Sequence, residues 1–147
     1  MQITIVCVGK VKEAFYRAAV EEYRKRLSRY CKTEIVEVPD EMTKDGAGEA
    51  MDDLVRKKEG ERLLSRIRPD AFVITLEITG KKMDSIQFAK VLQRACVEGK
   101  SHIQFIIGGS LGLHDSVSRR ADLKLSFSDM TFPHQLMRVI LCEQIYR

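Results

Sequence analysis

The sequence predicts a single α/β domain, residues 1–147, with a mainly parallel sheet flanked by helices. Short apolar segments typical of strands alternate along the chain with longer segments of helical periodicity, and glycines and prolines separate them. The length of 147 residues suits one domain, and 44% hydrophobic with 31% charged residues is ordinary for a globular protein. No repeat or low-complexity segment interrupts this pattern.

The first part of the chain predicts a strand, a helix and a second strand. Residues Ile3–Val8 form a β-branched apolar run that stops at Gly9. Residues 13–30 carry apolar side chains at every fourth position, and this spacing makes one stripe of a helix. Residues 33–38 alternate in polarity and stop at Pro39, as expected for a strand.

The middle of the chain predicts a loop, a helix and a third strand. The polar stretch Asp40–Glu49 contains two glycines and is the clearest loop. A charged helix is expected from Ala50 to Ile67, because Pro69 cannot continue it. The apolar run Ala71–Glu77 predicts a strand buried on both faces.

Residues Thr79–Lys82 predict a turn into the next helix. That helix is expected to begin at an N-cap, Asp84 or Ser85, and to end near Glu98. A fourth strand is predicted over His102–Ile107.

The remaining segments continue the alternation. Gly108 begins a glycine-rich turn, and we expect a short helix near 115–121 and a fifth strand over 123–127. A last helix from Pro133 is apolar nearly all round, which predicts that it is buried, with a subunit interface as one possible site.

Composition excludes several classes of protein. The four cysteines are scattered without the C-x₂₋₄-C spacing of a zinc site, so we expect no metal and a reducing compartment. No segment approaches the ~18 apolar residues of a membrane span. The apolar start of the chain lacks the basic region of a signal peptide. These features predict a cytoplasmic protein without membrane contact.

The net charge of +4 is compatible with an RNA partner. Lysines and arginines cluster at residues 24–26, 56–58, 81–82 and 119–120. Acidic residues close to the first two clusters would equally suit solvated helix faces. Charge alone leaves both interpretations open.

Ligands of open α/β sheets bind beyond the carboxyl ends of the strands. The strand ends at residues 76–80, 108–112 and 127–134 stand out here. Neither a G-x-G-x-x-G motif after the first strand nor a complete P-loop motif at Gly80 is present. The glycines from Gly108 to Gly112 would let a backbone approach a ligand, or would simply make a tight turn.

The chain nevertheless resembles one family closely. The runs that carry the resemblance are 105–113 (FIIGGSLGL), 125–139 (LSFSDMTFPHQLMRV), 3–12, 34–41, 58–60 and 76–81. They cover essentially the whole chain and are similar to those of the RlmH family of SPOUT-class methyltransferases.

The resemblance implies S-adenosylmethionine-dependent methylation of N3 of a pseudouridine in 23S ribosomal RNA of the assembled ribosome. It also implies a homodimer, a SPOUT fold with a C-terminal trefoil knot, and no metal. Matching the motif position by position assigns the cofactor to Leu76, Gly108, Phe127, Ser128, Asp129, Met130, Thr131 and Phe132. A non-catalytic α/β module that binds RNA or ribosomes is the alternative.

Methylation at N3 requires removal of a weakly acidic proton, so a cation or a base should help. Arg138 and Arg147 are the catalytic candidates: Arg138 is a lone charge early in an apolar helix, and Arg147 follows Tyr146 at a family position with a proposed role. His134 is a third candidate, which we expect instead to bond the backbone at the helix start.

The resembled family continues past this Tyr-Arg pair into a short Tyr-His-basic tail that the sequence here lacks. We expect a chain without that tail to dimerise and to bind cofactor weakly but to methylate poorly.

Overall fold

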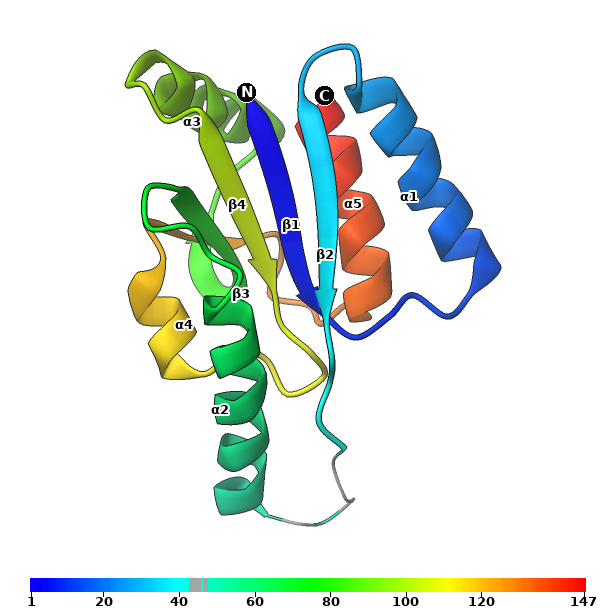
Figure 1. Cartoon of the computed structure of the whole chain (residues 1–147), viewed down its shortest axis with the longest axis vertical. Helices are drawn as coiled ribbons and strands as arrows, with labels where there is room; N and C mark the ends of the chain where they lie inside the picture. The colour runs from blue at the N-terminus through cyan, green and yellow to red at the C-terminus, as the bar shows by residue number, and fades with distance from the viewer. Residues whose placement is uncertain (43–45, 47) are drawn as a thin grey trace.

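The computed structural model describes residues 1–42, 46 and 48–147. Strands and helices alternate as predicted (Figure 1). In chain order they are β1 Gln2–Val8, α1 Ala14–Leu27, β2 Lys32–Val38, α2 Glu49–Leu64, β3 Phe72–Lys82, α3 Ser85–Val97, β4 His102–Ile107, α4 Asp115–Arg120, β5 Leu123–Ser126 and α5 His134–Tyr146. The predicted loop Asp40–Glu49 lies partly outside the described residues, and α2 already begins at its last residue.

The five strands form one parallel sheet in the order β2-β1-β4-β3-β5. This confirms the predicted α/β class. Because every strand runs in the same direction, all carboxyl ends meet along one edge of the sheet (Figure 1). The chain begins and ends at the opposite edge, where both termini lie (Figure 1).

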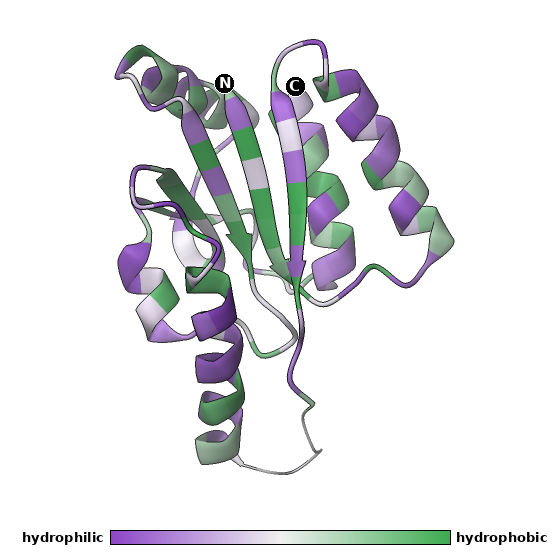
Figure 2. Ribbon diagram, viewed as in Figure 1, coloured by the Kyte–Doolittle hydropathy of each residue, from purple (hydrophilic) through white to green (hydrophobic). Residues whose placement is uncertain are grey.

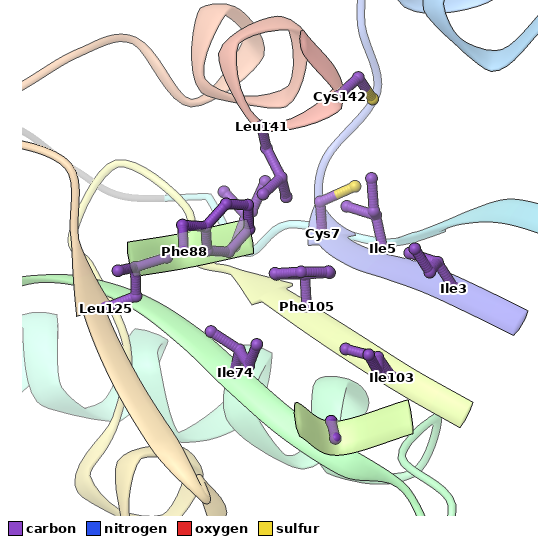
Figure 3. Close-up of a cluster of buried hydrophobic side chains, with 12 residues drawn as sticks. Ile3, Ile5, Cys7, Ile74, Phe88, Ile103, Phe105, Leu125, Leu141 and Cys142 are labelled. Carbon is purple, nitrogen blue, oxygen red and sulfur yellow. The ribbon is translucent and has the colours of Figure 1, made fainter. Parts of the chain in front are cut away.

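Helices cover both faces of the sheet, and each face has its own core. Alternate residues of β1 show the division: Ile5 belongs to the same buried cluster as Phe88 of α3 and Leu141 of α5 (Figure 3). Val6 packs on the other face, with residues of α2 and α4. Burial on both faces explains why these strands are nearly continuous apolar runs. Figure 2 shows apolar residues concentrated in the central strands and a mixture of apolar and polar residues along the helices.

The predicted turn at Thr79–Lys82 is wrong, because β3 continues to Lys82. The ladder with β5 changes register instead: Leu76 and Lys81 both lie opposite Leu125. The intervening residues bulge out of the ladder. A Cβ atom on Gly80 would come within 2.8 Å of the Lys124 carbonyl, so only glycine fits where the two strands approach.

The chain crosses the carboxyl edge between β5 and α5. Strand β5 is the outer neighbour of β3, whereas α5 packs against α1 and the face of β1 and β4. Residues 127–133 must therefore pass across the ends of the strands between them (Figure 1). The trefoil knot that the resemblance implies stays a prediction.

Arg138 anchors the start of α5, which follows this crossing. Its side chain is 1% exposed, and Nη1 donates to Glu37 Oε2 at 2.6 Å. Nη2 donates to the carbonyl oxygens of Val8 (3.1 Å) and Gly9 (2.7 Å), at the end of β1. One guanidinium thus ties α5 to the carboxyl ends of β1 and β2, with the strength of charge-assisted hydrogen bonds.

No helix in the part of the chain that the structure describes combines the length and the apolar character that a membrane crossing requires.

Replacing Arg138 should destabilise the fold. Arg138→Met removes the cation that pairs with Glu37 and the donor of two carbonyl groups, which should lower the free energy of unfolding by about 3 kcal/mol. Arg147→Met is the matched control, because that exposed arginine of the same helix makes only a surface ion pair with Glu143. Urea unfolding measures both variants, and equal losses would refute the role of Arg138 as the fastening point.

Candidate functional site

A cleft of about 910 Å³ opens at the carboxyl edge of the sheet. Its walls are the bulge of β3, the loop that follows β4 and the loop that follows β5. These are the three strand ends that the sequence analysis selected. The volume lies within the ~300–1,000 Å³ range typical of small-molecule sites.

The glycine-rich turn forms one wall of the cleft. Gly112 N–H donates to the Gly109 carbonyl at 3.1 Å, and Gly112 has φ +85°, a conformation that favours glycine. A Cβ atom on Gly108 would lie 2.9 Å from the backbone of Gly112. The absence of a side chain at Gly108 is therefore required by the tight turn itself.

The buried Glu59 supports this turn from beneath. Its carboxylate accepts from the Glu41 N–H at 3.1 Å and lies against Gly109, where an added Cβ would meet Oε1 at 3.2 Å. Burial raises the pKa of Glu59 above its ordinary value. Glu59 lies within one of the runs that carry the family resemblance, but no role was predicted for it from the sequence.

The loop after β5 forms the opposite wall, and serines fix its backbone. Ser126 Oγ donates to the Ser128 carbonyl at 3.1 Å, and Ser128 Oγ accepts from the Met130 N–H at 3.0 Å. Asp129 turns away and pairs with Lys82. The loop therefore presents a fixed backbone to the cleft.

Seven of the eight predicted cofactor residues line the cleft. They are Leu76, Gly108, Phe127, Ser128, Met130, Thr131 and Phe132. Asp129 does not, since its carboxylate is engaged with Lys82. Proximity alone does not test binding, so the assignment of all eight stays a prediction.

The described charged side chains of the lining are mostly acidic. Carboxylates come from Glu49, Asp53, Glu77 and Asp115, against the single guanidinium of Arg56. Apolar side chains, among them Ile107, Leu125 and Met137, cover much of the remaining wall. Such a lining favours an amphipathic ligand with positive charge and disfavours phosphate groups.

Two of these charged groups also organise the cleft. The Glu77 carboxylate accepts from Thr75 Oγ1 and from Ser118 Oγ, both at 2.7 Å, and so joins β3 to α4. Arg56 donates to the Leu111 carbonyl at 3.5 Å and pairs with acidic residues of α2. Neither residue has a role predicted from the sequence, although Glu77 directly follows a buried apolar run.

His134 also lines the cleft, as the first residue of α5. The expectation that it bonds the backbone at the helix start is wrong: the helix has no side-chain cap, and Nδ1 is buried without a partner among the described residues. Burial, together with the positive charge of Arg138, holds the pKa of His134 below its ordinary value of 6.5.

The two predicted catalytic arginines do not line the cleft. Arg138 is buried beside it and bonds Glu37 and β1, so the structure places it as a fastening residue. Arg147 lies at the other end of α5, near the N-terminus of the chain (Figure 1). Within one chain it is remote from the cleft, and its catalytic role stays a prediction.

The buried cysteines are unsuited to nucleophilic chemistry. Burial raises the thiol pKa values of Cys7 and Cys142 to about 12, which keeps both thiols protonated at neutral pH. Across residues 1–42, 46 and 48–147, no cluster of histidine, cysteine or acidic residues has an arrangement that could hold a metal ion.

Comparisons with known proteins identify similar chains. The family model described as "Predicted SPOUT methyltransferase" matches residues 1–147. Proteins named ribosomal RNA large subunit methyltransferase H from Bifidobacterium adolescentis, Bifidobacterium animalis subsp. lactis and Clostridium kluyveri are 57%, 55% and 52% identical over the whole chain, which spans 92% of each.

A solved structure supports the fold independently. The structure of a probable methylase family protein from Haemophilus influenzae Rd KW20 aligns with a TM-score of 0.56 at 12% identity. The alignment covers 98% of this chain and 64% of that one. At this identity the similarity concerns the fold alone.

A side chain at position 108 should disturb the turn. Gly108→Ala places a methyl group 2.9 Å from the Gly112 backbone, which should cost about 1–3 kcal/mol of unfolding free energy. In Gly109→Ala the nearest atoms, 3.2 Å away or more, belong to the side chains of Glu59 and Val8, so the loss should be smaller. Urea unfolding compares the two variants, and a larger loss for Gly109→Ala would contradict this account of the turn.

Proposed function

The chain belongs to the SPOUT methyltransferase family, and on that premise we propose that it methylates large-subunit ribosomal RNA with S-adenosylmethionine as methyl donor. The observation that carries the proposal is the convergence of three strand-end segments, each named by the sequence motif, on a single cleft. The names of relatives at 52–57% identity over the full chain support the RNA substrate.

The lining of the cleft suits this cofactor. S-adenosylmethionine combines a neutral adenosine with a sulfonium and an ammonium group, and the cleft combines apolar walls and ordered backbone with an excess of carboxylates. Leu76, Gly108 and the loop from Phe127 to Phe132 would hold the cofactor. When bound, it supplies a methyl group already activated by the positive sulfur, so the protein needs no nucleophile of its own.

We further propose the finer substrate that the resemblance implies, N3 of a pseudouridine in 23S ribosomal RNA, methylated in assembled ribosomes in the cytoplasm. The work of the protein is then to align the ring nitrogen with the methyl group and to remove its proton. Only the target base enters the acidic cleft, while the phosphates stay outside it.

The rim beside the start of α5 suits the RNA backbone. Lys10 and Lys12 are exposed there, and the Lys12 N–H donates to Gln135 Oε1 at 3.3 Å. The side chain of Phe15, 66% exposed, lies nearby in the chain and offers a surface on which a base could stack. Basic rim and acidic interior together favour entry of a base without its phosphate.

A homodimer would cover the outer side of α5. Leu136, Val139 and Ile140 are only half-buried in the single chain, although the sequence predicts a helix buried all round. A second copy packed on this apolar side would complete their burial. The same arrangement would allow Arg147 to serve the site of the partner subunit, which a single chain does not permit.

Cofactor binding is the first test. Isothermal titration should detect S-adenosylmethionine binding, and Ser128→Ala should weaken it about 5-fold, because the loop loses a backbone hydrogen bond. Ser65→Ala is the matched control, since that serine bonds the Arg62 carbonyl at the end of α2. Absence of binding by the full-length protein would favour the non-catalytic RNA-binding module instead.

Methyl transfer is the second test. Ribosomes from a strain that lacks the gene should accept one radiolabelled methyl group per large subunit, and mass spectrometry of the RNA should locate it on N3 of a pseudouridine. Free ribosomal RNA should be a much poorer acceptor. Labelling of a different nucleotide would contradict the finer substrate while leaving the RNA methyltransferase activity in place.

A further inference from the structure

One polar side chain of the cleft makes no hydrogen bond with the described part of the chain. His134 Nδ1 is buried and has no hydrogen-bond partner among those residues, although its ring lines the cleft. The ring lies beside Gly9, where an added Cβ atom would come 3.8 Å from Cε1, and Arg138 anchors α5 one turn later. An imidazole that makes no hydrogen bond with the described residues is available for chemistry.

We propose that His134 is a catalytic residue, which removes the proton from the methyl-accepting nitrogen of the target base. This inference rests on the proposed function, since it assumes that the methyl group goes to a nitrogen that carries a proton.

The surroundings of His134 keep its imidazole neutral. Burial disfavours the charged ring, and the positive charge of Arg138 on the same helix adds to this, so that both lower the pKa of His134 below 6.5. The carboxylates that face it, Asp40 after β2 and Glu13 before α1, act in the opposite direction but more weakly. At neutral pH the ring therefore has an unprotonated nitrogen ready to accept a proton.

Several other titratable groups of the lining are less suitable. Both oxygens of Glu77 accept hydrogen bonds from hydroxyl groups, and His114 Nδ1 accepts from the Ser116 N–H at 3.2 Å as the cap of α4. Arg56 has no lone pair to offer. Of the two histidines among the described lining residues, His134 is the one whose ring makes no hydrogen bond with the described chain.

The step balances in atoms and charge. The N–H bond of the base breaks as its proton passes to the imidazole, and the nitrogen lone pair forms the new bond to the methyl carbon. The bond from that carbon to the sulfur breaks, and its electron pair returns the sulfonium to a neutral thioether. His134 leaves the step as imidazolium and then releases the proton to water.

The test compares His134→Gln with the matched control His102→Gln. His102 is a buried histidine at the amino edge of the sheet, where Nε2 lies 2.7 Å from Thr4 Oγ1, far from the cleft. Both variants are made in the full-length protein and assayed where they are folded. We expect His134→Gln to slow single-turnover methyl transfer to ribosomes about 100-fold or more. The affinity of this variant for S-adenosylmethionine should stay within about 2-fold of that of the wild type. The rate of His102→Gln should match the wild-type rate.

The pH dependence separates proton removal from mere positioning. A base whose folded pKa lies below 6.5 is lost as the pH falls through that value, so the wild-type rate should decline on the acid side. His134→Gln should lack that decline, and added imidazole should partly restore His134→Ala. Nuclear magnetic resonance titration of the free protein should independently give His134 the lowered pKa.

Three outcomes overturn the inference. They are a His134→Gln variant as active as the wild type, an unchanged acid decline in that variant, and a titration that gives His134 an ordinary or raised pKa. Each of them would leave the proposed function intact in an active wild-type protein. A wild-type protein that transfers no methyl group to ribosomes would instead refute the proposed function itself.

Discussion

The passage of the chain across the carboxyl edge of the sheet is the constraint on which the site depends. Strand β5 pairs with β3 at one end of the strand order, yet α5 packs near β1, so residues 127–133 have to span the strand ends between them. Arg138 secures the far side through Glu37 and the last carbonyls of β1. The backbone of residues 127–133, held at both ends, forms one wall of the cleft. This wall is ordered before any ligand binds, which lowers the entropic cost of binding.

The same arginine links stability with chemistry. Burial lowers the pKa of the His134 imidazole, and the buried charge of Arg138, one helical turn away, lowers it further. The interaction that anchors α5 thus also favours the neutral form of the one lining histidine that makes no capping bond. Anchoring and proton chemistry are therefore coupled through a single side chain, and changes at Arg138 alter both.

Charge divides the region into two parts. The described lining has four carboxylates against one guanidinium, while exposed lysines lie on the rim beside the start of α5. A polyanion is repelled by the first and attracted by the second. This division is consistent with a cationic cofactor in the interior and a single base reaching it from outside, as the proposed reaction requires.

Local sequence patterns were sufficient to predict most of the fold and the segments that line the cleft. Apolar runs, helical periodicity and the positions of glycine and proline were enough for the parallel α/β sheet, because strands buried on both faces have a distinctive composition. The rule that ligands bind at carboxyl strand ends, joined to the family motif, selected seven residues that line the cleft. The bulge of β3 was missed, since Thr79–Lys82 has turn composition and only pairing with β5 makes it a strand.

Side-chain roles were decided by the tertiary structure alone. Three side-chain hydrogen bonds show this, because each joins residues more than 40 positions apart in the chain: Lys82 to Asp129, Arg138 to Glu37, and Ser118 to Glu77. His134 lines the cleft and does not make the backbone bond expected from the sequence, because its surroundings come from distant segments of the chain. The sequence by itself determined which segments meet at the sheet edge, because periodicity and turn residues act locally. Which groups are paired and which are left free for chemistry depends on contacts between distant segments, and only the folded chain brings those together.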